Sequence, residues 1–81
     1  METIEDKKQQ YRTYIGKRIA EERSRLGLSQ RDLANLSGVN HATIAKIELG
    51  RWSAGIDMLG RIAEAMGLKV DLVHKCVTMN D

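Results

Sequence analysis

Four glycines divide the middle of this chain into short segments, and their positions constrain the fold more than any other feature. Gly27, Gly38, Gly50 and Gly67 each follow a stretch in which apolar residues recur at steps of three and four, the spacing of one helix face. Glycine adopts, without a steric cost, the left-handed conformation in which many helices end. We therefore expect four short helices, each ending at one of these glycines.

The four expected helices lie at about residues 13–26, 29–37, 40–49 and 55–66. Ser29 and Asn40 are of the type that caps a helix N-terminus, and Asp32 stands three positions after Ser29, as in a capping box. Gly16 lies inside the first helix, where a glycine costs about 1 kcal/mol relative to alanine. We interpret it as a local weakness of that helix.

After the last of these glycines the spacing of apolar residues changes from helical to alternating. Leu68, Val70 and Leu72 alternate with charged residues, and 73–77 continue an extended, β-branched tract. This pattern predicts one C-terminal β-strand. Because a lone strand has no partner in its own chain, its edge can pair with another chain. We expect Leu68, Val70 and Leu72 to form the interface of a homodimer.

The segments predict one small, mostly helical domain of 81 residues. The expected divisions are a polar N-terminal extension over 1–12, a helical domain over 13–67, and the strand with its tail over 68–81. No apolar run approaches the roughly 18 residues that cross a membrane, and the N-terminus does not resemble a secretory leader. These features predict a cytoplasmic protein that does not bind membranes.

The net charge of +2, from 13 Lys and Arg against 11 Asp and Glu, hardly separates a nucleic-acid binder from an ordinary soluble protein. Both ends of the chain are neutral, so the excess lies in residues 13–67. From charge alone a solvated surface of mixed charge is the favoured interpretation, since such a balance is ordinary for soluble domains. Charge alone leaves both interpretations open.

Residues for catalysis or metal binding are sparse. Cys76 is the one cysteine, which excludes an internal disulfide and a cysteine-based zinc cluster. His41 and His74 are not spaced as metal ligands, and there is no Gly-rich phosphate loop. We expect no enzymatic activity, no metal and no cofactor. We interpret Cys76 as a small hydrophobic residue, with a redox switch as the alternative.

The segment from Ser29 to Gly50, SQRDLANLSGVNHATIAKIELG, resembles the phage-repressor (Cro-like, XRE-type) helix-turn-helix family, with a likeness that extends over about residues 15–68. The matching residues are Gln30, Ala34, Gly38, Val39, Ile44 and Ile47, together with the flanking LGLSQ and ELG sequences. The resemblance implies a lambda-repressor-like fold of four to five short helices and a bacterial or phage origin. It also implies that the third helix, residues 40–49, enters the major groove of double-stranded DNA.

The resemblance also implies which residues contact DNA. Base contacts fall to His41, Ala42 and Lys46, which can offer a ring nitrogen, a methyl group and a cation to base edges. Ala42 departs from relatives with a long polar side chain there, so their target sequences do not transfer. The residues implied to contact the DNA backbone are Gln30, Arg31, Thr43, Arg51 and Ser53, with packing as the alternative role of Thr43.

The residues themselves support a DNA-facing third helix. If Ile44 and Ile47 face inward, the opposite face of residues 41–49 contains no acid, so it can approach phosphates. The resemblance further implies a structural ion pair between Arg23 and Glu48 that orients this helix. Trp52 has two open roles, as a lid over the third and fourth helices or as a contact to the DNA backbone.

These observations predict a sequence-specific DNA-binding transcriptional regulator that acts as a homodimer, with repression as the expected effect. The alternative is an antitoxin that regulates its own operon and also binds a toxin protein, a role for which the C-terminal strand is an argument. A pure adaptor without DNA binding is a third possibility, and the acid-free face of the third helix argues against it.

Overall fold

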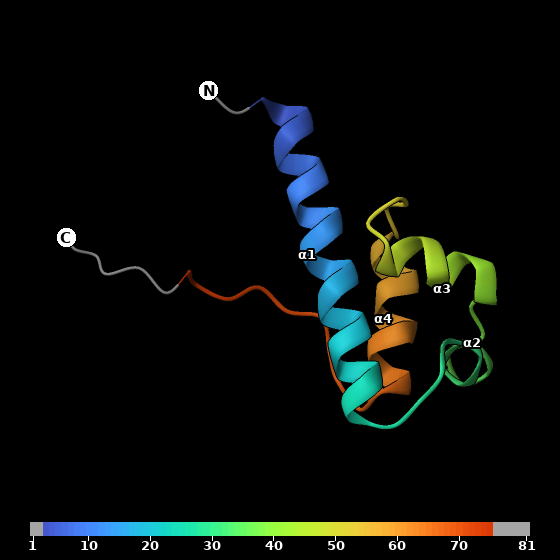
Figure 1. The fold of residues 1–81 in the computed structure, drawn as a ribbon. Coiled ribbons are helices and arrows are strands. Elements are labelled where there is room, and N and C mark those ends of the chain that lie inside the picture. The colour runs from blue at the N-terminus through green and yellow to red at the C-terminus, as the bar shows by residue number, and fades with distance from the viewer. Residues whose placement is uncertain (1–2, 76–81) are drawn as a thin grey trace.

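The computed structural model describes residues 3–75 and contains four α-helices. They are α1 (Ile4–Arg25), α2 (Gln30–Ser37), α3 (His41–Glu48) and α4 (Ile56–Ala65), arranged as Figure 1 shows. α1 packs on α3, and α2 packs on both α3 and α4. Since α2 and α3 have only eight residues each, which is too short for a stable isolated helix, packing supplies their stability.

The predicted helix ends are confirmed. Gly27, Gly38, Gly50 and Gly67 all adopt the left-handed conformation, with φ angles of 73 to 75°. Side chains that bond only across a few residues cap the starts of α1, α2 and α3, and left-handed glycines follow the ends of all four helices. The helical segments between them are therefore set by local sequence.

Two of the helix starts show the predicted caps. Ser29 Oγ accepts from the Asp32 backbone N–H, while Asp32 Oδ2 accepts from the Ser29 backbone N–H, each at 2.9 Å. The bond from the Ser29 N–H is the main reason why the pKa of Asp32 lies below its usual value. Asn40 Oδ1 accepts from the Ala42 N–H at 2.8 Å and caps α3.

The predicted start of the first helix near residue 13 is wrong, because α1 begins at Ile4 and has 22 residues. Thr3 and Asp6 form a second capping box, with backbone-to-side-chain bonds of 3.0 and 3.1 Å. The expectation was based on apolar spacing, which the polar first turns of α1 lack. Residues 4–12 are therefore helical, and the division of the chain into domains stays a prediction.

One residue from each of α2, α3 and α4 forms the centre of the core. Leu33, Ile44 and Ile62 are completely buried. The other buried apolar residues around them are Ile19, Ala34, Val39, Ile47 and Met66. These positions follow the helical spacing seen in the sequence, so each helix directs its apolar stripe to the same centre.

Gly16 is buried where α1 crosses the end of α3. A Cβ atom built on it would lie 2.9 Å from the Glu48 carbonyl oxygen and closer still to that of Ile47. Both obstacles are backbone atoms, which cannot move aside as a flexible side chain can. The interpretation of Gly16 as a helix weakness is therefore incomplete, because only glycine lets the two helices approach this closely.

The chain continues beyond α4 without regular secondary structure as far as residue 75. Leu68 packs against the core, whereas Val70 is 44% and Leu72 is 95% exposed. There is no strand within residues 3–75, so the C-terminal strand and its pairing across a dimer stay a prediction. Cys76 and Val77, the last residue of the predicted tract, lie outside the described residues.

Two further observations apply to the described part of the chain. None of its helices combines the length and the apolar character that crossing a membrane requires. It also has no group of three or more His, Cys, Asp or Glu side chains placed to hold a metal ion.

Candidate nucleic-acid interface

A tight turn at Gly38 joins α2 to α3. The buried Ser37 hydroxyl donates to the Ala34 carbonyl oxygen at 3.5 Å and accepts from the Val39 N–H at 3.2 Å. Val39 is only 3% exposed and anchors the turn in the core. Because both ends of the turn are fixed in this way, α3 has a defined orientation relative to α2.

α3 has an inward and an outward face, as its sequence predicts. Ile44 and Ile47 are buried, whereas Ala42, Lys46 and Leu49 are exposed, Leu49 being the residue that ends the helix. The residues of intermediate burial along this helix are His41, Thr43, Ala45 and Glu48. The exposed positions therefore carry the cation of Lys46 and no acid.

The one acid of α3 points into the protein. Arg23 Nε and Nη2 donate to the two carboxylate oxygens of Glu48 at 2.7 and 3.0 Å, a bidentate pair. The Glu48 side chain is 6% exposed and that of Arg23 is 16% exposed. Arg23 Nη1 also donates to the Leu28 carbonyl oxygen at 2.9 Å. The hydrogen bonds to the Glu48 carboxylate raise the pKa of Arg23, so the guanidinium stays protonated.

Gln30 also belongs to this network, which the sequence analysis missed. Its Nε2 atom donates to Glu48 Oε1 at 2.9 Å, linking the first turn of α2 to the end of α3. The resemblance implies that Gln30 contacts a DNA phosphate, through its side-chain amide and the backbone N–H groups nearby. The side-chain nitrogen is instead engaged inside the protein, although the residue is only partly buried.

The other residues expected to contact the DNA backbone lie on the surface or near it. Arg31, Arg51 and Ser53 are exposed, and Thr43 is partly buried. The Arg51 backbone N–H donates to the Lys46 carbonyl oxygen at 2.9 Å, which ties the loop after α3 to that helix. This hydrogen bond fixes the backbone position of Arg51 relative to the end of α3, where Lys46 lies.

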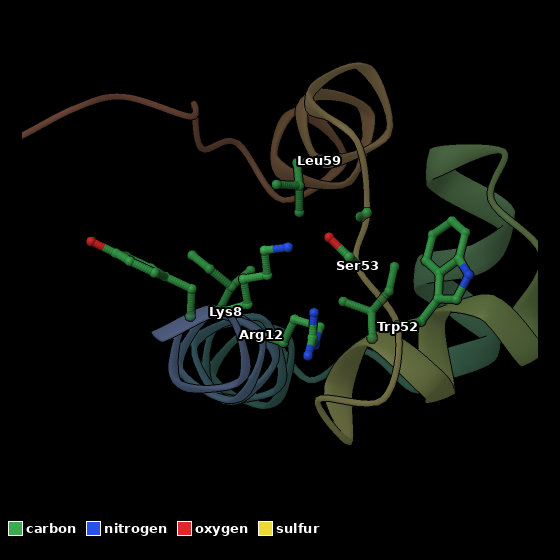
Figure 2. A pocket seen from close by; sticks show the side chains of 9 residues that line it. Lys8, Arg12, Trp52, Ser53 and Leu59 are labelled. Atoms are coloured by element: carbon green, nitrogen blue, oxygen red, sulfur yellow. The ribbon is translucent and has the colours of Figure 1, made fainter. Parts of the chain in front are cut away.

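Trp52 lies in the same loop and is 40% exposed. Figure 2 shows its indole extending away from Lys8 and Arg12, on the other side of the loop. The exposed fraction means that Trp52 covers the core only in part. The choice between a lid and a backbone contact stays a prediction.

Gln9 is a second contact that the sequence analysis missed. Its Nε2 atom donates to the Gly50 carbonyl oxygen at 3.0 Å, so the early turns of α1 are attached to the end of α3. The two residues are 41 positions apart. The capping box at Thr3 is the signal that would have extended the predicted helix to include Gln9. Nothing in the sequence, however, indicates that Gln9 contacts Gly50.

Two short helices joined by a glycine turn, the second with an exposed face free of acids, define a helix-turn-helix protein. The chain belongs to the helix-turn-helix family HTH_3, whose sequence profile matches residues 19–73.

Relatives and a solved structure agree with this family. The HTH-type transcriptional regulator PuuR of Escherichia coli (strain K12) is 42% identical over 55 residues, which are 68% of this chain and 30% of PuuR. An uncharacterized HTH-type transcriptional regulator of Methanothermobacter thermautotrophicus is 45% identical over 49 residues, which are 60% of this chain and 71% of that protein. The chain thus spans about 30% of the length of PuuR.

The structural likeness is to the crystal structure of an HTH_3 family transcriptional regulator from Vibrio cholerae. The TM-score is 0.74 at 29% sequence identity, and the match covers 76% of this chain and 35% of that one. The four-helix arrangement is therefore one that a solved member of the family also has.

Proposed function

We propose that this chain is a sequence-specific DNA-binding transcriptional regulator that inserts α3 into the major groove. The observation that carries the proposal is the outward face of α3, where Lys46 is exposed while Glu48 is turned inward to Arg23. An α-helix fits the major groove, which is about 12 Å wide and is bordered by phosphates that repel exposed acids. The names of the relatives, HTH-type transcriptional regulators, support the same role.

Within this proposal His41, Ala42 and Lys46 contact base edges. Lys46 can donate to guanine acceptors, and the Ala42 methyl group can touch a thymine methyl. The residues proposed to contact backbone phosphates are Arg31, Thr43, Arg51 and Ser53, with Gln30 beside them. Phosphate contacts position the protein, and base contacts select the sequence.

We expect Lys46→Ala to lower affinity for the target duplex by about fivefold to a hundredfold, because a base contact of this kind is worth about 1–3 kcal/mol. Selection from a random duplex pool supplies the target sequence, and fluorescence anisotropy measures the affinity. Lys17→Ala is the matched control, since it removes one exposed cation from α1. Equal losses in the two variants would contradict the role of Lys46.

Gln30→Ala is a less specific test of a DNA backbone contact than Arg31→Ala. Because Gln30 donates to Glu48, removing its amide also disturbs the network that holds α3. Arg31→Ala leaves that network intact and reports on the backbone contact alone. Loss of a phosphate contact weakens binding to a similar extent for all DNA sequences, so we expect Arg31→Ala to lower affinity for target and random duplexes alike.

We propose that the regulator is a homodimer formed by the C-terminal segment. Leu72 and Val73 are 95% and 84% exposed, which is unusual for apolar residues without a partner. Leu68 packs against its own core, which leaves Val70 and Leu72 the larger part of the proposed interface. Two copies could then place their α3 helices in successive major grooves, about 34 Å or roughly 10 base pairs apart.

Sedimentation equilibrium tests the homodimer. We expect the wild type to have twice the monomer mass at micromolar concentration and Leu72→Asp to be monomeric, because a charge cannot be buried in an apolar interface without a large cost. Lys69→Asp is the control, since it places the same charge at a neighbouring exposed position. A wild type of monomer mass would contradict the proposal.

We propose repression as the outcome of binding, and we prefer the regulator role to that of an antitoxin. The relatives described above carry regulator names, which favours the regulator role.

A further inference from the structure

The first turns of α1 continue past the end of α3, as Figure 1 shows. A groove of about 550 Å³ lies between these turns and the loop that follows α3. Ile15 and Leu59 contribute to its apolar lining, and Ser53 lines it from the loop. In Figure 2 the side chains of Lys8 and Arg12 extend from α1 into this groove, toward the loop. None of the residues that line the groove is acidic.

Hydrogen bonds fix the position of this part of α1 relative to the loop. Gln9 Nε2 donates to the Gly50 carbonyl oxygen at 3.0 Å. Thr13 lies against Gly50, whose Cβ, if it had one, would be 3.1 Å from the Thr13 Cα atom. The first turns of α1 are therefore attached to the same loop that begins at the end of α3.

Among the described residues, the hydrogen-bond partner that orients the cation of Arg12 is neutral. Its Nε and Nη2 atoms donate to Gln9 Oε1 at 3.3 and 3.1 Å, and this oxygen belongs to a neutral amide. The chain of contacts from Gly50 through Gln9 to Arg12 thus places a guanidinium beside the loop. A pre-oriented guanidinium loses less side-chain entropy when it binds a phosphate.

Lys8 can bind a phosphate because its present ion pair is weak. Its ammonium group lies 3.4 Å from Glu5, in a pair whose side chains are 58% and 77% exposed. Exposed ion pairs of this kind contribute little and exchange readily in solvent. A phosphate next to the groove can therefore replace Glu5 as the partner of Lys8.

We propose that Lys8 and Arg12 bind backbone phosphates of the DNA next to those contacted by the loop after α3. The proposal rests on the DNA-binding function proposed above and adds a second contact surface to it. Ser53 connects the two, since it lines the groove and is also one of the proposed backbone-contacting residues. Lys8 and Arg12 are four positions apart on one helix face, which lets both follow the same strand.

The test compares Lys8→Ala and Arg12→Ala with Lys17→Ala, all three as the full chain. Lys17 has the same exposed charge but lies nearly half a turn away from Lys8 and Arg12 around α1. The probe is a labelled duplex of random sequence, long enough for two half-sites, because phosphate contacts do not depend on sequence. Fluorescence anisotropy over a series of salt concentrations gives both the affinity and its salt dependence.

We expect each of the two groove variants to lose affinity by about threefold to tenfold at about 0.1 M salt, and the slope of log affinity against log salt to become shallower by about one for each cation removed per protomer. Arg12→Lys, which keeps the charge but not the planar fork, should retain most of the affinity. A loss in Arg12→Lys equal to that in Arg12→Ala would overturn the proposed phosphate contact of Arg12.

The proposal is overturned if Lys8→Ala and Arg12→Ala bind as Lys17→Ala does while the wild type still binds the duplex. That result would leave the DNA-binding function in place. If the wild type itself binds no duplex at low salt, the proposed function and this inference fail together. Circular dichroism of Lys8→Ala, Arg12→Ala and Lys17→Ala serves as the control for folding.

Discussion

Gly16→Ala should lower the free energy of unfolding by about 3 kcal/mol, although the same change in an unconstrained helix would raise it by about 1 kcal/mol. The reason is the crossing of α1 over the end of α3. The new methyl group would meet the carbonyl oxygens of Ile47 and Glu48, and neither can move without shifting α3. Urea denaturation followed by circular dichroism measures the change.

Gly60→Ala is the matched control for this experiment. Gly60 lies inside α4, and a Cβ atom at this position would meet no heavy atom within 4 Å. The alanine gains helix propensity and restricts the unfolded chain, so we expect it to stabilise the protein by about 0.5–1 kcal/mol. If Gly16→Ala stabilised the protein as well, the close approach of α1 and α3 would be wrong.

The same substitution should also affect DNA binding. Because the obstacle lies at the end of α3, any relaxation that admits the methyl group displaces this helix from α1. A displaced α3 no longer presents Lys46 and the loop at Arg51 in their original arrangement. We therefore expect whatever folded Gly16→Ala protein remains to bind the target duplex more weakly.

Arg23→Met should cost about 3–5 kcal/mol, the second large effect. The substitution leaves the Glu48 carboxylate nearly buried without its cation, and removing one partner of a buried ion pair has a cost of this size. The hydrogen bond from Gln30 remains, but a neutral amide does not compensate the charge. Urea denaturation again measures the loss.

A double-mutant cycle separates the pair from its surroundings. The stability loss of the double variant Arg23→Met/Glu48→Met should be smaller than the sum of the two single losses by about 2 kcal/mol. The reason is that the double variant removes both charges together. Met fills much of the space of either side chain. A coupling energy within about 0.5 kcal/mol of zero would mean that the two side chains act independently, which would end the structural role of the pair.

The sequence predicted the outward face of α3 well because that face depends on one short period. Once Ile44 and Ile47 are buried, Ala42 and Lys46 must point the other way. Gln30 was interpreted less completely, because its position at the start of α2 does not reveal that Glu48 lies next to it. Resemblance supplied the partner of Arg23 but not this third member of the network.

The start of α1 was missed for a different reason. The signal was present, since Thr3 and Asp6 have the spacing of a capping box. Apolar spacing, however, fades before Ile15, and the first turns of α1 have little apolar surface to bury. These turns instead contact the rest of the protein through the hydrogen bond from Gln9 to Gly50. A single hydrogen bond of this kind leaves no periodic pattern in the sequence.

The sequence by itself determined the positions of the helix caps, the glycine ends and the apolar faces, because each depends on residues within about four positions of one another. Only the tertiary structure decided what Gly16, Gln30 and Gln9 contact. Each of these contacts joins residues that are far apart along the chain, and their geometry exists only once the helices have packed. Local rules therefore define the outward face of α3, whereas packing decides how firmly this helix is held and which cations lie beside it.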